Sequence, residues 1–338
     1  MRHLKWMLIF VLILSISLTG CLKKDAGDVV KDLEKKLDSL TSYKAIGNMS
    51  IKIQEQQDYL VEVWYKDPHY YRIALTNNNS KVTQIVLRND DGVFVIDPSL
   101  NKSYRFKSDW PESNGAVYLY YSLANSIIDD LDREYVKEED YYVFDVKANY
   151  QNQTLVKQKI WLDKDLRPSK VVVIDTQDTD LIEMVFTDFQ FNYSFDGDAF
   201  DMQRNLTGYD LNVLPAMGDV TQSSSFGFIE PTYIPDGVAK NAPKFVENND
   251  GASVVIKYTG TYSYSLMEAR PKAITASAPE LSETDIVDLG YGIGILTSMD
   301  EMKTLTWLYD GVEFTLSGDL PKQEMIKVAE SVFGQSGK

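Results

Sequence analysis

Apolar and polar positions along the chain follow two different periods. Val29, Val30, Leu33, Leu37 and Leu40 recur at helical spacing and predict one amphipathic helix over 29–40. After residue 42 the period changes to two, and short alternating segments are separated by Gly, Pro, Asn and Asp. This pattern is typical of antiparallel strands joined by tight turns. The segments are 43–53, 59–65, 69–75, 82–88, 92–98, 103–107, 141–148, 154–163, 168–175 and 182–192.

One long apolar segment interrupts the alternating series. Residues 116–136, "AVYLYYSLANSIIDDLDREYV", are apolar on most sides until Asp129. A helix that is apolar nearly all round belongs in an interior, so we expect a buried helix here. Residues 211–227, which contain Pro, Gly and a Ser run, end the first series and predict a linker. Further short strands follow, and "PKQEMIKVAESVF" (321–333) predicts a final helix that begins near Pro321.

The first 21 residues carry a different signal. Arg2 and Lys5 precede an uncharged, largely apolar run from Trp6 to Gly20. This is a basic segment followed by a hydrophobic segment, as in a secretory signal peptide. Leu18-Thr19-Gly20-Cys21 then resembles the lipobox of bacterial lipoproteins. That resemblance implies cleavage between Gly20 and Cys21 and attachment of a lipid to Cys21, which is the only Cys in the chain. An uncleaved anchor helix and an ordinary signal peptide with a chance Cys are the alternatives.

The composition narrows the classes of partner. The chain has 34 Lys and Arg against 50 Asp and Glu, a net charge of −16. Such a surface repels phosphate backbones and anionic headgroups, so we expect no nucleic-acid partner and membrane contact through the lipid anchor. With one Cys, the chain can form no internal disulfide.

Residues 28–205 resemble the LolA family of lipoprotein carriers. The resemblance depends on the order of "SYKAIGNMSI", "VEVWYKDPHYYRI", "RNDDGVFVIDP" and "KIWLDKDLRPSKVVVID". It implies an α+β fold in which an open, curved antiparallel half-barrel holds helices in its concave face. In that family the concave face accepts acyl chains. LolA carriers are soluble, whereas a chain tethered at Cys21 could not travel.

The C-terminal part resembles a small domain of unknown function from extracytoplasmic Gram-positive proteins, on the basis of "YIPDGV", "LTWLYDGVEFTLSG" and the last helix. The two parts in this order resemble the YdcC-type lipoproteins of spore formers, which implies a role in sporulation. We therefore expect five segments: a signal peptide (1–20), a lipidated tether (21–27), a LolA-like domain (28–210), a linker (211–227) and a small α+β domain (228–338).

The resemblance also implies candidate binding residues. The candidate acyl-pocket residues are Tyr59, Val61, Val63, Trp64, Tyr65, Tyr71, Ile73, Trp161 and Phe186. The alternative for each is ordinary core packing, because aromatic side chains dominate protein cores. Arg72 is a candidate latch that would hold the lid helices to the sheet. Its alternative is an outward Arg paired with a carboxylate.

Catalytic and metal-binding candidates are weak. His69 is the only His after the signal peptide and lies at a Pro turn, where a solvated side chain is the simpler interpretation. Asp196, Asp198 and Asp201 form an acidic cluster without EF-hand spacing. The glycines of "GYGIG" (290–294) do not fit a dinucleotide-binding motif. We therefore expect no enzyme, no metal and no cofactor.

Two functions remain at this point. The first is a lipid-anchored protein on the extracytoplasmic face of the cell membrane that binds an acyl chain or a lipoprotein in its half-barrel. The second is a structural or signalling envelope protein whose barrel is a filled core and whose C-terminal domain docks a protein partner. A pocket beneath 116–131 would favour the first function. An exposed apolar patch on 228–338 would favour the second.

Overall fold

The computed structural model describes most of the chain after the N-terminal segment. The described residues are 24–52, 56–99, 102–106, 110, 116–150, 155–208, 228–248, 251–269, 284–289, 292–299, 302–309 and 312–333. The predicted linker 211–227 and Cys21 lie outside them. No helix in this part of the chain is long and apolar enough to cross a membrane.

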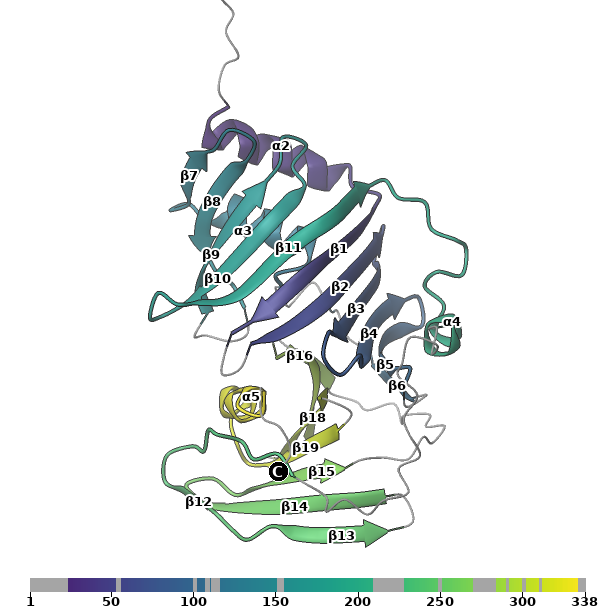
Figure 1. Ribbon diagram of the computed structural model, residues 1–338, viewed down its shortest axis with the longest axis vertical. Coiled ribbons are helices and arrows are strands. Elements are labelled where there is room, and N and C mark those ends of the chain that lie inside the picture. The colour runs from purple at the N-terminus through teal and green to yellow at the C-terminus, as the bar shows by residue number, and fades with distance from the viewer. Residues whose placement is uncertain are drawn as a thin grey trace, which may run out of the picture.

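The first half of the chain forms an 11-stranded antiparallel sheet, the first sheet, in which neighbouring strands are mostly consecutive along the chain (Figure 1). The order is β6-β5-β4-β3-β2-β1-β11-β10-β9-β8-β7, so β1 pairs with β11 at its centre. The path ends at β6 and β7 without closing, so the sheet is open. The strands are β1 (Ser42–Ile51), β2 (Gln57–Lys66), β3 (Tyr70–Asn77), β4 (Thr83–Asn89), β5 (Gly92–Asp97), β6 (Lys102–Phe106), β7 (Glu134–Lys137), β8 (Tyr142–Lys147), β9 (Leu155–Leu162), β10 (Pro168–Asp175) and β11 (Asp180–Phe191).

Two helices share the core of this sheet. Helix α2 (Ala26–Asp38) begins with a capping box in which Asp25 accepts from the Asp28 amide and the Asp28 side chain accepts from the Asp25 amide. Its apolar side, Val29, Val30 and Leu33, is buried. Helix α3 (Tyr120–Asp129) lies behind the sheet in Figure 1 and contacts α2.

The opposite face of the sheet carries a second, smaller core. Helix α4 (Met202–Thr207) covers it, and Phe200 packs there with side chains of β3, β4 and β5. The sequence pattern did not predict α4, because the helix is short and its anchoring aromatic residues lie in an Asp-rich segment.

The second half of the chain forms an eight-stranded antiparallel sheet, the second sheet, with one helix packed on it. The order is β12-β14-β15-β19-β18-β17-β16, and β13 also pairs with β14. The elements are β12 (Val238–Lys240), β13 (Lys244–Asn248), β14 (Gly251–Gly260), β15 (Tyr264–Ala269), β16 (Thr284–Asp288), β17 (Ile293–Met299), β18 (Met302–Tyr309), β19 (Val312–Gly318) and α5 (Lys322–Glu330).

The predicted fold class is confirmed, with one correction to the elements. An open antiparallel sheet with helices against one face is followed by a smaller sheet with a helix. The helix predicted over 116–136 is too long, because α3 ends at Asp129 and residues 134–137 form β7. Asp129, Asp130 and Asp132 follow the last apolar turn, so no apolar stripe continues the helix.

Candidate functional site

The concave face of the first sheet is continuous and apolar. Alternation along β2 places Tyr59, Val61, Val63 and Tyr65 on this inner face, where all are buried. Antiparallel register aligns Val63 with Ala45 of β1 and Ile73 of β3, so the same face continues across three strands. The sheet brings seven of the nine predicted pocket residues together on this face. They are Tyr59, Val61, Val63, Tyr65, Tyr71, Ile73 and Phe186.

The prediction was wrong for Trp64 and Trp161. Successive strand residues point to opposite faces, so Trp64 lies on the outer face between the buried Val63 and Tyr65. It packs against Phe195 and Phe200 in the smaller core. Trp161 likewise faces outward, with the Lys159 ammonium 5.2 Å from its ring centroid. Neither side chain can line the inner face.

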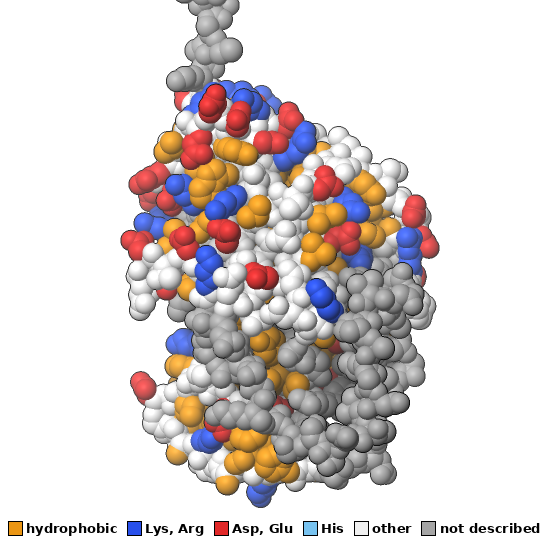
Figure 2. Space-filling model, in the orientation of Figure 1, with side chains coloured by type: hydrophobic (Ala, Val, Ile, Leu, Met, Phe, Trp, Pro, Cys, Tyr) orange, Lys and Arg blue, Asp and Glu red, His pale blue; other side chains and the backbone are white. Residues whose placement is uncertain are grey.

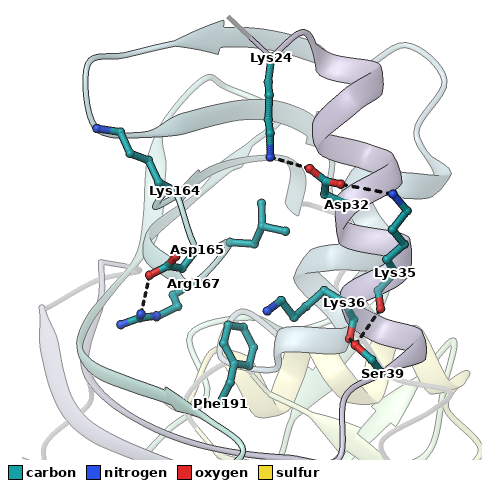
Figure 3. Close-up of a pocket in the computed structure, with 10 residues that line it drawn as sticks. Lys24, Asp32, Lys35, Lys36, Ser39, Lys164, Asp165, Arg167 and Phe191 are labelled. Carbon is teal, nitrogen blue, oxygen red and sulfur yellow. Dashed lines mark hydrogen bonds and ion pairs between the residues drawn. The ribbon is translucent and has the colours of Figure 1, made fainter. Parts of the chain in front are cut away.

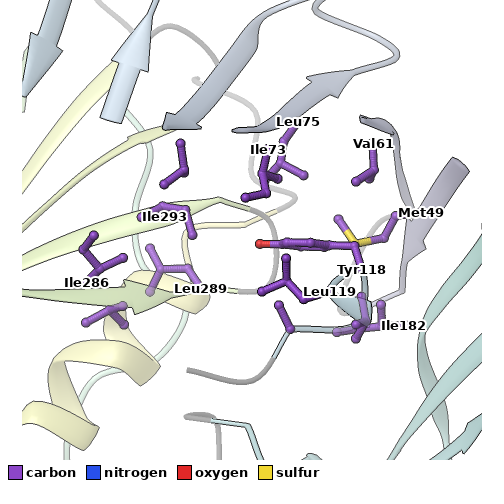
Figure 4. Packing of buried hydrophobic residues seen from close by; sticks show 14 of the residues in the cluster. Met49, Val61, Ile73, Leu75, Tyr118, Leu119, Ile182, Ile286, Leu289 and Ile293 are labelled. Carbon is purple, nitrogen blue, oxygen red and sulfur yellow. The ribbon is translucent and has the colours of Figure 1, made fainter. Parts of the chain in front are cut away.

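Helix α3 and the residues before it cover the inner face. Tyr118 and Leu119 lie among Met49, Val61 and Ile182 (Figure 4), and both are buried. These contacts fill the centre of the concavity with the chain's own side chains.

Tyrosine hydroxyls link α3 to its surroundings. The Tyr120 amide donates to the Tyr43 hydroxyl at 3.3 Å, and the hydroxyls of Tyr121 and Tyr65 lie 3.4 Å apart. Burial raises the pKa of Tyr65, and the neighbouring Tyr121 adds to the rise. The Tyr65 phenol therefore stays neutral and acts as a hydrogen-bonding group.

The second sheet contributes to the same core. Leu289, directly after β16, and Ile293, the first residue of β17, are buried and lie toward Ile73 and Leu75 in Figure 4. The Leu289 amide donates to the Gly292 carbonyl at 2.9 Å and closes the turn. We call the pair Leu289 and Ile293 the hairpin tip.

Two hydrogen bonds join the sheets next to the hairpin tip. The Ile293 amide donates to Gln84 Oε1 of β4 at 2.9 Å. The Tyr104 hydroxyl of β6 donates to Glu313 Oε2 of β19 at 2.5 Å. The C-terminal half thus takes part in covering the first sheet. The sequence carries no local signal for this contact, because its partners lie more than 200 residues apart.

The prediction that Arg72 latches the lid helices was wrong. Its side chain lies on the outer face, where Nε donates to Asn205 Oδ1 of α4 at 2.6 Å and a terminal nitrogen donates to Glu62 at 2.8 Å. The guanidinium also lies 4.3 Å from the Trp64 ring centroid. Burial alone would raise the pKa of Glu62, but the attraction of Arg72 and Lys44, together with hydrogen bonding to the carboxylate, outweighs burial and lowers this pKa. Arg72 therefore holds α4, and its carboxylate pairing follows the alternative interpretation.

The other polar candidates have structural partners. His69 Nε2 lies 2.9 Å from Asp90, and its ring stacks on Tyr70. Asp196 and Asp198 pair with Arg204, and Asp201 caps α4 by accepting from the Arg204 amide at 2.7 Å. Of "GYGIG", residues 290 and 291 lie outside the described part, and the following three residues lead into β17. No cluster of metal-ligating side chains occurs within the described ranges.

Each half of the chain matches a known family model. The model described as "Sporulation protein YdcC-like" matches residues 1–200, and a domain of unknown function, DUF4367, matches residues 229–332. The chain is 38% identical to sporulation protein YdcC of Bacillus subtilis (strain 168) over 338 residues, which cover 97% of this chain and 98% of that protein.

Solved structures with weaker likeness include two bacterial proteins. One is the MucA/MucB complex of Pseudomonas aeruginosa, with 13% identity, TM-score 0.33, and coverage of 93% of this chain and 99% of that one. The other is an outer membrane lipoprotein-sorting protein domain from Vibrio parahaemolyticus, with 16% identity, TM-score 0.32, and coverage of 54% and 99%.

Proposed function

The chain belongs to the sporulation protein YdcC-like family, and from that membership we propose a lipid-anchored, non-enzymatic sporulation protein that binds an acyl chain. It would reside on the extracytoplasmic face of the cell membrane, attached through Cys21. The ligand would be a lipid or the acyl part of a lipoprotein, bound against the inner face of the first sheet.

The observation that supports this proposal is which elements cover the inner face of the first sheet. The apolar inner face is closed by α2, by α3 with residues 116–119 and by the hairpin tip, rather than by further strands of the same sheet. Displacing these elements would uncover apolar surface, and each Å² that a ligand buries contributes about 25 cal/mol. An acyl chain could therefore replace the contacts that α3 makes in the unliganded protein.

A specific observation favours a second function. All seven inner-face candidates are already buried, as a filled core would require. On the second sheet, Phe245 and Val246 of β13 are 61% and 44% exposed, so this strand offers apolar side chains to a partner. A protein that docks a partner through β13 and never opens its half-barrel would fit both facts.

Mass spectrometry separates the two functions. The chain that starts at residue 22 keeps every described residue, and we expect it to carry a noncovalent lipid adduct after purification from a lipid-containing host without detergent. Leu289→Ala should raise the occupied fraction, because it weakens the hairpin tip that covers the inner face. Leu316→Ala is the matched control, since Leu316 is equally buried in the second sheet but lies outside the hairpin tip.

The outcomes are distinct. A clean apo mass for wild type and for Leu289→Ala, unchanged after lipid is added, would contradict acyl binding and favour the docking function. The intact mass of the full chain from a Gram-positive host tests the anchor separately, through the diacylglyceryl increment expected on Cys21.

A further inference from the structure

A pocket lies at the end of the first sheet where α2 crosses it (Figure 3). It has a volume of about 550 Å³ and is formed by α2, the end of β11 and the turn between β9 and β10. Its lining includes Lys24, Asp32, Lys36, Leu166, Arg167 and Phe191.

The lining carries five cations and two carboxylates in a chain whose net charge is −16. Asp32 is shared between Lys24, at 2.6 Å, and Lys35, at 3.7 Å. The hydrogen bond with Lys24 lowers the pKa of Asp32, so this carboxylate stays ionised. Lys36 reaches into the pocket in Figure 3 and has no carboxylate partner within the described ranges. Around the rim, Asp163 and Asp165 face Arg167, and Asp140 faces Lys164.

The walls of the pocket are set by local structure. Asp163 Oδ1 accepts from the amides of Asp165 and Arg167, at 2.9 and 2.8 Å, and so fixes the turn. Within this turn Leu166 adopts φ of 66° and is buried. On the other side, Lys36 Nζ lies 4.5 Å from the Phe191 ring centroid.

The floor of this pocket is continuous with the aromatic core under α3. Phe191 packs against Tyr120, the first residue of α3, with ring centroids 5.2 Å apart. Tyr120 also packs against Tyr43 and Phe189. A ligand with an anionic head and an apolar tail could thus place the head among the lysines and direct the tail toward α3.

The position along the chain points to a membrane source for such a ligand. Lys24 lies three residues after Cys21, and three extended residues span at most about 11 Å. If Cys21 carries the lipid anchor, this edge of the pocket lies close to the headgroup layer. The net negative charge of the whole chain does not prevent this, because exposed charges more than about 10 Å apart are largely screened at 0.1 M salt.

We infer that this pocket binds the phosphate group of an anionic phospholipid whose acyl chains occupy the inner face of the first sheet. The inference rests on the proposed acyl binding and names the ligand class. Lys36 and Arg167 supply ammonium and guanidinium donors for the phosphate, while Leu166 and Phe191 contact the start of the chains.

Competition between two lipids with identical chains tests the inference. The chain of residues 22–338 is mixed with equal amounts of phosphatidylglycerol and phosphatidylcholine, and the two adducts are compared by native mass spectrometry. We expect about a tenfold preference for phosphatidylglycerol. The double substitution Lys36→Gln with Arg167→Gln, which removes the two proposed phosphate donors, should abolish this preference.

The matched control removes the same number of positive charges outside the pocket. Lys31→Gln with Lys157→Gln removes two exposed cations that do not line the pocket, and it should keep the preference. Equal amounts of the two lipid adducts in wild type would overturn the inference while leaving acyl binding intact. An equal loss of the phosphatidylglycerol preference in both double variants would do the same. Absence of any adduct would overturn both.

A competition arm distinguishes a lipid headgroup from free phosphate. Inorganic phosphate at millimolar concentration should leave the preference unchanged, because it lacks the acyl chains that contribute apolar burial. If it abolishes the preference, the pocket is a free-phosphate site and the lipid assignment is wrong.

Discussion

At the scale of single residues, the side of the strand decides what each candidate does. Val63 and Trp64 are neighbours in sequence, yet one lies under α3 and the other under α4. Arg72 follows the same rule, because Tyr71 and Ile73 occupy the inner face on either side of it. Because its side chain points outward, Arg72 supports α4 and does not contact α3.

Replacing Arg72 tests this role. Arg72→Met leaves Asn205 Oδ1 without its donor and leaves Glu62 with Lys44 as its remaining cation, so we expect the free energy of unfolding to fall by about 3 kcal/mol in urea titrations. Arg105→Met removes an exposed Arg that donates to the Asp91 carbonyl, and it should cost under about 1 kcal/mol. Hydrogen exchange should quicken in α4 but not in α3; the reverse pattern would restore the lid-latch role.

The loss of stability caused by Arg72→Met should depend on pH. The folded-state pKa of Glu62 is lowered, so its pairing stabilises the fold above the unfolded glutamate pKa of about 4.3 and is lost as pH falls through the folded value. The difference in unfolding free energy between wild type and Arg72→Met should therefore shrink as the pH is lowered to 3.

At the scale of elements, the two-residue period predicted most strands of the first sheet because one face of each is buried. Burial alternates along β2 and β11 as the sequence pattern requires. The short edge strand β7 escaped prediction because three of its four residues are exposed, so no alternation marks it. Helix α4 was not predicted for a related reason. Its stability comes from Arg72 and Phe200, which lie outside the helix.

Gly47 lies at an irregularity in the pairing of β1 with β11. The register shifts between Ile46 and Gly47, and a Cβ at position 47 would lie 2.4 Å from the Val185 carbonyl oxygen. We expect Gly47→Ala to lower the unfolding free energy by about 1–3 kcal/mol, because a backbone atom must move. Gly197→Ala is the control, since nothing lies within 4 Å of its added methyl group. Equal stability of the two variants would show that this bulge tolerates a side chain.

At the scale of the whole molecule, the two sheets form one continuous core. Local sequence patterns predict the strands of each half. The hydrogen bond from Ile293 to Gln84 joins residues 209 positions apart, and no local pattern predicts it. The candidate site was therefore only partly predictable. Its sheet residues could be found from alternation, while the hairpin tip and the pocket beside α2 required the three-dimensional arrangement.

This arrangement predicts that opening the inner face also disturbs the contact between the sheets. Tyr118 and the hairpin tip belong to the same core, so a ligand that displaces one must alter the other. The mixture of acidic, basic and apolar side chains over the first sheet in Figure 2 belongs to the outer face and would remain unchanged.

Tryptophan quenching by a mid-chain brominated fatty acid tests acyl binding to the inner face most directly. Trp110 is buried beside Tyr71, with ring centroids 6.2 Å apart, whereas Trp161 faces outward. A bound chain should quench the emission of wild type and of Trp161→Phe and leave Trp110→Phe largely unquenched. Equal quenching of the two variants, or none in wild type at saturating ligand, would contradict acyl binding on this face.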